Sequence, residues 1–195
     1  MNVLVCCEES QRTCIAFRER GFNAFSCDIK KCSGGHPEWH IQNDAIDTLY
    51  SQSWDLVIAH PPCTYLSKAG AVRLFPGGVR DENRWKHLLA ARSFFMDFYN
   101  YHRCPIAIEN PVPFKGVLPP PDQIIHPYYF GDPYTKATCL WLYDLPPLVA
   151  TDLVKPLGSW TLLHSSQNIR SKTFPGVARA FADQWGLGYC QKSFF

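Results

Sequence analysis

Short apolar runs, separated by amphipathic stretches, dominate the first half of the chain. The runs over 2–7, 23–27, 56–59 and 106–108 are nearly continuous in apolar residues and end at polar or turn-forming residues. Such runs are typical of strands that are buried on both faces of a sheet. Residues 11–20 have helical character, so the chain begins with a strand, helix, strand unit whose two strands are parallel. The pattern predicts an α/β fold with a mostly parallel sheet and helices on both faces.

The rest of the pattern predicts three helices, one strand and three irregular segments. The longest helix, over 81–101, places a stripe of large side chains at helical spacing, and we expect this stripe to be core: Trp85, Leu88, Leu89, Phe95, Phe98 and Tyr99. A short helix follows Asp44, and a last helix over 173–185 has Pro175 in its first turn. The expected strand covers 138–143, and irregular structure is expected over 29–41, 111–133 and 146–159. Nothing in the composition divides the chain, so we predict one domain over 1–195.

The stretch Asp55–Leu66 combines a buried strand with a rigid loop. The apolar run Leu56–Ala59 stops at His60 and two successive prolines, which cannot donate to a sheet ladder. Cys63 therefore lies just beyond the carboxyl end of a central strand, where parallel sheets collect ligands and reacting groups. Most cysteines are buried core residues, but this placement favours a functional thiol at Cys63.

A second candidate group follows the next buried strand. Residues 106–108 lead directly into Glu109, and the order of the strands predicts that Glu109 lies near Cys63 at the same sheet edge. A thiol and a carboxyl group suit chemistry on a heteroaromatic ring, where the thiol attacks a carbon and the acid protonates a ring nitrogen. The thiol needs help to ionise, and His60, Lys136 or a basic residue of a nearby loop could provide it.

The loop after the first strand has the sequence CCEESQ and contains no glycine. A pyrophosphate requires close approach of a glycine-rich backbone, so this loop argues against a dinucleotide. A cofactor without phosphates, such as S-adenosylmethionine, is compatible, and Glu8 can pair with its amino acid end. Asp28, which ends the second strand, is where such folds hold ribose hydroxyls. Ser10 is expected to cap the first helix, while Asp44 either faces the adenine or caps its own helix.

Composition narrows the class of protein. The chain has 195 residues, of which 46% are hydrophobic, and a net charge of +2. These values exclude a disordered protein and give no sign of tight non-specific nucleic-acid binding, although a local basic patch is compatible. No apolar run reaches the roughly 18 to 20 residues of a membrane span. The nine cysteines show no framework spacing and no signal peptide is recognisable, which together predict a reduced, cytoplasmic setting.

Two loops carry weaker signals. Cys27, Cys32, His36 and His40 have a metal-like spacing, but it matches none of the common closed zinc patterns, so we predict no metal site. The glycine-punctuated segment 67–78 has the character either of a lid that closes over a substrate or of an ordinary surface loop.

The order of these motifs resembles that of the DNA (cytosine-5) methyltransferases, and the whole chain is similar to the short forms carried by phages and prophages. The most specific matches are Pro61-Pro62-Cys63 and Glu109-Asn110, the latter reading ENP where the family has ENV. The resemblance implies a Rossmann-like class I S-adenosylmethionine-dependent methyltransferase fold. It further implies transfer of a methyl group to carbon 5 of cytosine, with Cys63 as the covalent nucleophile and Glu109 contacting the base.

The resemblance also implies a set of binding residues. Lys136 and Thr138 stand where the family's QxRxR motif has its two arginines, and Phe174-Pro175-Gly176 resembles the closing motif that returns to the cofactor. The residues expected to bind the cofactor are Cys6, Glu8, Ser10, Asp28, Ile29, Asp44, His60 and Pro62. The residues expected to bind the substrate are Pro61, Asn110, Lys136 and Thr138.

The segment between Tyr143 and Ser166 is too short for a full target-recognition domain. The expected substrate is therefore DNA, including single-stranded DNA, or a nucleotide, and a partner protein or a second copy of the chain would supply target recognition. Two other functions stay open. The HPPCTY loop can act like the DPPY loop of amino-methyltransferases, or the protein can be a catalytically silent binder of nucleotide or cofactor, such as a decoy or an assembly component.

Overall fold

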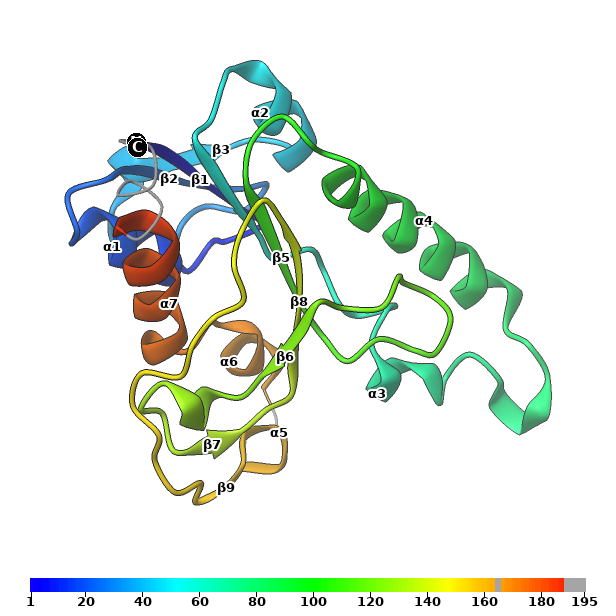
Figure 1. Ribbon diagram of the computed structural model, residues 1–195. Helices are drawn as coiled ribbons and strands as arrows, with labels where there is room; N and C mark the ends of the chain where they lie inside the picture. Colours follow the sequence, from blue (N-terminus) through cyan, green and yellow to red (C-terminus); the bar gives the residue numbers. More distant parts are fainter. Residues whose placement is uncertain (164–165, 188–195) are drawn as a thin grey trace.

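A seven-stranded sheet forms the centre of the computed structural model, which describes residues 1–163 and 166–187 (Figure 1). The strand order is β3-β2-β1-β4-β5-β8-β6, and β8 runs in the opposite direction to the other six strands. The strands are β1 (Asn2–Cys6), β2 (Asn23–Asp28), β3 (His40–Gln42), β4 (Leu56–Ala59), β5 (Ile106–Pro111), β6 (Gln123–Ile125) and β8 (Thr138–Tyr143). A separate parallel pair consists of β7 (Tyr134–Thr135) and β9 (Gly158–Ser159).

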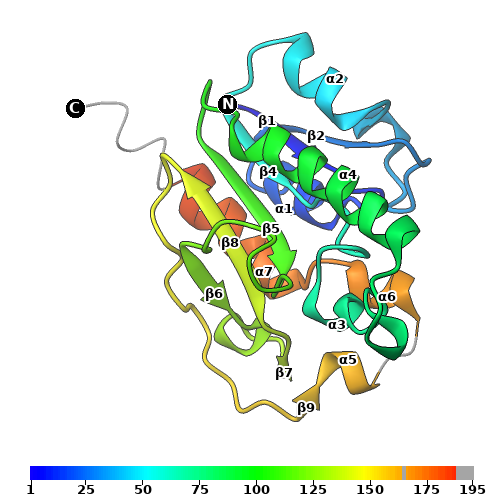
Figure 2. The same ribbon diagram turned by 90° about the vertical axis from the view of Figure 1, so that its right-hand side faces the viewer.

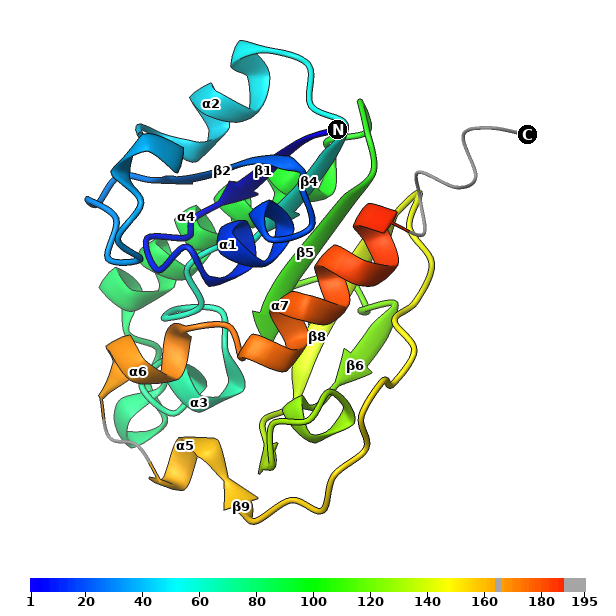
Figure 3. The ribbon, with the colours of Figure 1, turned by 90° about the vertical axis from the view of Figure 1, so that its left-hand side faces the viewer.

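Helices cover both faces of the sheet. Helices α1 (Arg12–Arg18) and α7 (Pro175–Phe181) pack together on the face seen in Figure 3. Helices α2 (Ala45–Ser51) and α4 (Glu82–Tyr99) lie on the opposite face, seen in Figure 2. The short helices are α3 (Lys68–Ala71), α5 (Trp160–Leu163), α6 (Gln167–Ser171), three 3-10 turns (Pro37–Trp39, Pro76–Gly78 and Pro127–Tyr129) and a π-helical turn (Ala182–Leu187) that continues α7.

The helices on both faces of the sheet explain why the central strands are continuous apolar runs. Along β1, Val3 and Val5 belong to the core cluster that contains Phe181, whereas Leu4 belongs to the cluster that contains Phe95. Alternate side chains of a strand point to opposite faces, so both faces of a central strand need apolar residues. The predicted fold class is confirmed: the sheet is mostly parallel and has helices on both faces.

Several local predictions need correction. The segments expected to be irregular contain the edge strands β3 and β6, which are three residues long and whose pairing with β2 and β8 decides their conformation. In α4, Leu88, Phe95 and Phe98 are buried as predicted, but Leu89 is 49% exposed. The last helix does not begin at residue 173 but at Pro175.

In the described part of the chain, no helix combines the length and the apolar character that crossing a membrane requires. All cysteines in this part are free thiols, and Cys190 lies outside the described residues.

Candidate functional site

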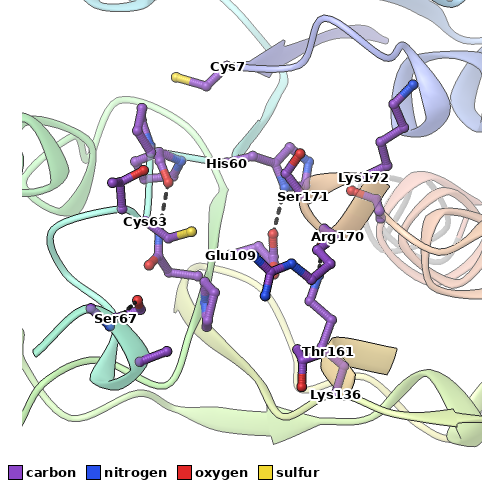
Figure 4. A pocket seen from close by; sticks show the side chains of 18 of the residues that line it. Cys7, His60, Cys63, Ser67, Glu109, Lys136, Thr161, Arg170, Ser171 and Lys172 are labelled. Carbon is purple, nitrogen blue, oxygen red and sulfur yellow. Dashed lines mark hydrogen bonds and ion pairs between the residues drawn. The ribbon is translucent and has the colours of Figure 1, made fainter. Parts of the chain in front are cut away.

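An open cavity of about 1120 Å³ lies at the carboxyl ends of the central strands (Figure 4). Its wall includes the loop after β1, the end of β2, the diproline loop after β4 and the end of β5. Other parts of the wall come from the α3 segment, from residues 135–137 and 170–173, and from Arg84, His126, Ser159 and Thr161. This edge of a parallel sheet is where α/β proteins place their ligands, because the loops that follow the strands converge there.

Cys63 and Glu109 both line this cavity. Strand β5 lies directly beside β4, as the strand order predicted, and Ala59 is paired with Ile108. The residues that follow this pair, His60 and Glu109, are therefore neighbours across the two strands. In Figure 4 the Cys63 sulfur and the Glu109 carboxylate face the same open space.

His60 and Glu109 form a hydrogen-bonded pair, a contact that the sequence did not predict. His60 Nδ1 lies 3.0 Å from Glu109 Oε2, and the two side chains are only 10% and 14% exposed. Burial disfavours both charges, but the mutual hydrogen bond and attraction outweigh it, so the pKa of His60 is raised and the pKa of Glu109 is lowered. Lys136 contributes to the lower pKa of Glu109. The pair therefore favours an imidazolium and a carboxylate.

The Cys63 thiol is half-buried and has a raised pKa. Burial is the main cause, and the Glu109 carboxylate adds to it, whereas the charges of Lys136 and Arg170 act in the opposite direction. His60, which we had considered as an activator of this thiol, instead hydrogen-bonds Glu109. The cations that favour the Cys63 thiolate are thus Lys136 and Arg170.

The cavity wall is rich in cations, some of which sequence reasoning missed. Lys136 donates from Nζ to the carbonyl oxygen of Arg170 at 2.9 Å, which holds the two residues together. The basic residues of the wall are Lys30, Lys31, Arg73, Arg84, Lys136, Arg170 and Lys172, against the acidic residues Glu8, Glu9, Asp28 and Glu109. The excess of basic over acidic residues favours an anionic ligand. No sequence pattern revealed it, because the cations come from segments far apart in the chain.

The glycine-free loop after β1 adopts backbone conformations that usually require glycine. Cys7 and Gln11 both have φ of 59°, in the left-handed region. Gln11 is fully buried and is held by two hydrogen bonds to the backbone of His36. Gly34 packs against the same loop so closely that a Cβ there would lie 2.5 Å from Gln11 Cβ. The segment 29–41 therefore acts as a support for the first loop.

Glu8, rather than Ser10, caps the first helix. Its carboxylate accepts hydrogen bonds from the backbone N–H groups of Thr13 and Cys14 at 2.7 and 3.1 Å. The residue at the cap position is Gln11, whose side chain makes no capping bond. Because Glu8 occupies these N–H groups, the start of α1 offers no anion site of the kind that binds a pyrophosphate. Glu8 and Ser10 still line the cavity.

Only some of the other candidate cofactor residues line the cavity. Asp28, His60 and Pro62 lie on the cavity wall, and one oxygen of Asp28 accepts from the backbone N–H of Lys30. Cys6 is fully buried, because strand alternation points it into the core, and Ile29 is 70% exposed outside the wall.

Asp44 caps its own helix, the second of the two roles we considered. Its side chain accepts from the N–H groups of Ile46 and Asp47, and it does not line the cavity. Among the candidate substrate residues, Pro61, Asn110 and Lys136 line the cavity. Thr138 does not, because it is buried and its hydroxyl donates to the carbonyl of Lys136.

Three of the four residues with metal-like spacing contact different partners. Cys27 is buried and its thiol contacts Thr48, His40 contacts Ser26 through Nδ1, and His36 stacks on Trp39. Within residues 1–163 and 166–187, no three His, Cys, Asp or Glu side chains form a group that could hold a metal ion.

The donor groups of the wall near β1 and β2 fit S-adenosylmethionine. The carboxylates of Glu9 and Asp28 and the hydroxyl of Ser10 suit hydroxyl and ammonium groups, and the helix start does not select for phosphate. These residues could hold such a cofactor beside Cys63.

No family model and no curated protein matches the sequence. Among solved structures, a candidate DNA modification methyltransferase encoded within a prophage of E. coli matches with a TM-score of 0.50 and 12% identity, over 80% of this chain and 52% of that chain. DNMT2 from Spodoptera frugiperda, solved as a triple mutant, matches with a TM-score of 0.41 and 14% identity, over 80% of this chain and 55% of that one. The chain thus spans about half the length of these proteins. At this identity the first match informs the fold alone, and with the strand order above it identifies a Rossmann-like class I methyltransferase fold.

Proposed function

We propose that the protein is an S-adenosylmethionine-dependent methyltransferase that modifies carbon 5 of a cytosine base. The observation that carries this proposal is that Cys63 and Glu109, supplied by adjacent parallel strands, line one cavity together. That cavity also contains a wall, formed by Glu9, Ser10 and Asp28, that suits a phosphate-free cofactor.

The reaction requires both groups because carbon 5 of cytosine is a poor nucleophile. The Cys63 thiolate adds to carbon 6, and electron density moves through the ring to nitrogen 3. Glu109 supplies a proton to nitrogen 3, which leaves an enamine with a nucleophilic carbon 5. After methylation, the proton on carbon 5 passes to a water molecule, the Cys63 thiolate is eliminated and nitrogen 3 returns its proton to Glu109, which restores the aromatic ring. Bound S-adenosylmethionine supplies the electrophilic methyl group.

The substrate is a cytosine that is not paired when it enters the cavity. The cations of the wall, Lys136 and Arg170 among them, suit the phosphate of a nucleotide or of a single strand. A duplex would need its base flipped out, and target recognition would then come from a partner protein or a second copy of the chain.

Covalent trapping tests this function. The protein is incubated with labelled S-adenosylmethionine and a single-stranded oligonucleotide that contains 5-fluorocytosine, whose fluorine blocks the loss of the group at carbon 5. We expect a covalent adduct at Cys63 that disappears in Cys63→Ser and persists in Cys104→Ser, whose thiol does not line the cavity.

Other outcomes point to the alternative functions. Methylation of ordinary cytosine oligonucleotides without an adduct on the fluorinated one would indicate transfer to the exocyclic amine. Binding of oligonucleotide and cofactor with neither reaction would indicate a silent binder. Parallel arms with 5-fluoro-dCMP and with a duplex distinguish a free nucleotide and paired DNA from a single strand.

A further inference from the structure

The proposed reaction needs a proton at Glu109, yet Glu109 is held as a carboxylate. Its Oε2 lies 3.0 Å from His60 Nδ1. A carboxylate can only accept hydrogen bonds, so this contact requires the proton to reside on the imidazole ring. A proton for ring nitrogen 3 must therefore come to Glu109 from another group, and the nearest one in contact with it is His60.

We propose that His60 stores the proton that Glu109 delivers to nitrogen 3 of the substrate ring, an inference that rests on the proposed function. His60 and Glu109 then act as a relay of two groups. As Cys63 adds to carbon 6, Glu109 gives a proton to nitrogen 3 and His60 gives its Nδ1 proton to Glu109. When the Cys63 thiolate is eliminated, nitrogen 3 returns the proton through Glu109 to His60, so the relay ends as it began.

The fold places this relay by strand register. Ala59 pairs with Ile108, so the next residues of the two strands, His60 and Glu109, lie side by side at the cavity. Their side chains are nearly enclosed, at 10% and 14% exposure, which limits exchange of the proton with solvent. The far nitrogen of the ring, His60 Nε2, lies 3.4 Å from the Thr13 hydroxyl, which leaves an acceptor for its second N–H.

The charges around His60 come from three other segments and support a stored proton. Glu109 on β5 and Glu8 in the loop after β1 both favour the imidazolium, whereas Lys136, between β7 and β8, disfavours it. Two acidic residues therefore favour the charged ring of His60, and one basic residue disfavours it. The same Lys136 favours the Glu109 carboxylate and the Cys63 thiolate, so it suits the starting state of the reaction.

Exchange of the hydrogen on carbon 5 tests the relay without a methyl donor. Addition of Cys63 and protonation of nitrogen 3 make carbon 5 nucleophilic, so it takes up deuterium from heavy water. We expect the wild-type exchange rate to rise with pH as the Cys63 thiolate forms and to level off above the pKa of His60, because loss of the stored proton then offsets the gain in thiolate. In His60→Asn, whose side-chain amide can donate a hydrogen bond to Glu109 but cannot transfer a proton, exchange should be about 100-fold slower below the pKa of His60 and should keep rising with pH above it. His102→Asn, which changes an exposed histidine outside the cavity, is the matched control.

Nuclear magnetic resonance of labelled histidine provides a readout that needs no substrate. In the wild type we expect His60 to titrate above its ordinary value of 6.5 and to move toward or below that value in Glu109→Gln. A neutral His60 at pH 6 in the wild type would overturn the proposal, whether or not the variants fold.

The outcomes separate the two proposals. Wild-type exchange that persists unchanged in His60→Asn removes the relay and leaves the methyltransferase in place, because a hydrogen bond to Glu109 would then be sufficient. Loss of exchange in Cys63→Ser but not in His102→Asn, together with a slow His60→Asn, supports both. Absence of both exchange and covalent adduct in the wild type would contradict the relay and the proposed methyltransferase function alike.

Discussion

Asn110 donates from Nδ2 to the carbonyl oxygen of Pro61 at 2.7 Å, and so ties the end of β5 to the diproline loop that carries Cys63. Asn110 is 1% exposed, and both residues line the cavity. In Asn110→Ala the carbonyl of Pro61 loses its partner, which should lower the free energy of unfolding by about 1–3 kcal/mol and slow adduct formation at Cys63. Urea denaturation and the trapping assay measure the two effects.

Asn83→Ala is the control for this substitution, because Asn83 is exposed in the first turn of α4. Its free energy of unfolding should change by less than about 0.5 kcal/mol. An Asn110→Ala variant that is as stable and as reactive as the control would show that the link to Pro61 does not position Cys63.

The reactivity of the Cys63 thiol should respond in opposite directions to two substitutions. Burial and the Glu109 carboxylate raise the pKa of Cys63, while Lys136 lowers it. At pH 8, Glu109→Gln should therefore speed alkylation of Cys63 by iodoacetamide by at least about threefold, and Lys136→Met should slow it comparably. Mass spectrometry of the Cys63 peptide measures the rate, and Cys32 in the same digest is the internal control. A common direction of change in both variants would contradict this electrostatic account.

The His60 and Glu109 pair should make stability depend on pH. The raised pKa of His60 gives stability that is complete below 6.5 and is lost as pH rises through the raised value. The lowered pKa of Glu109 gives stability that is complete above 4.5 and is lost as pH falls through the lowered value. The pair therefore stabilises most between pH 4.5 and 6.5.

Denaturation of Glu109→Gln between pH 4 and pH 9 measures this contribution. Near pH 5.5 the variant should be less stable than the wild type by about 3 kcal/mol, and the difference should shrink at alkaline pH. Glu82→Gln is the control, because its ion pair with Arg80 is exposed, where such pairs contribute little. A difference that grows toward pH 9 would contradict the assignment of charges.

Gly34 should be intolerant of a side chain. A Cβ there would lie 2.5 Å from Gln11 Cβ and 2.7 Å from the carbonyl oxygen of Ser10, so Gly34→Ala must displace the loop after β1. We expect binding of S-adenosylmethionine, measured by calorimetry, to weaken by at least about tenfold. Gly158→Ala is the control, since its Cβ would meet only Leu163 Cδ1, at 3.7 Å. Equal affinity for S-adenosylmethionine in the two variants would show that the loop after β1 does not take part in cofactor binding.

The central strands could be predicted because their side chains are buried on both faces. For β1, β2, β4 and β5 this produces apolar runs that no solvent-facing element would carry. Strands β3 and β6 escaped prediction, because a three-residue edge strand is defined by the hydrogen bonds of its neighbour rather than by its own composition. Leu89 was misplaced for a related reason, since helical periodicity does not fix how wide the buried stripe is.

The sequence by itself determined that Cys63 and Glu109 each follow a buried strand, because apolar runs are a property of local composition. The order of the two strands along the chain predicted that they are neighbours, and the structure confirms this. Only the tertiary structure decided that His60 faces Glu109, since the contact depends on pairing Ala59 with Ile108 and a slip of one residue would turn the side chains to opposite faces. The tertiary structure also brought Arg170 and Lys172 to the cavity wall from the far end of the chain. Such long-range positions are set by the packing of the whole fold, which no local pattern encodes.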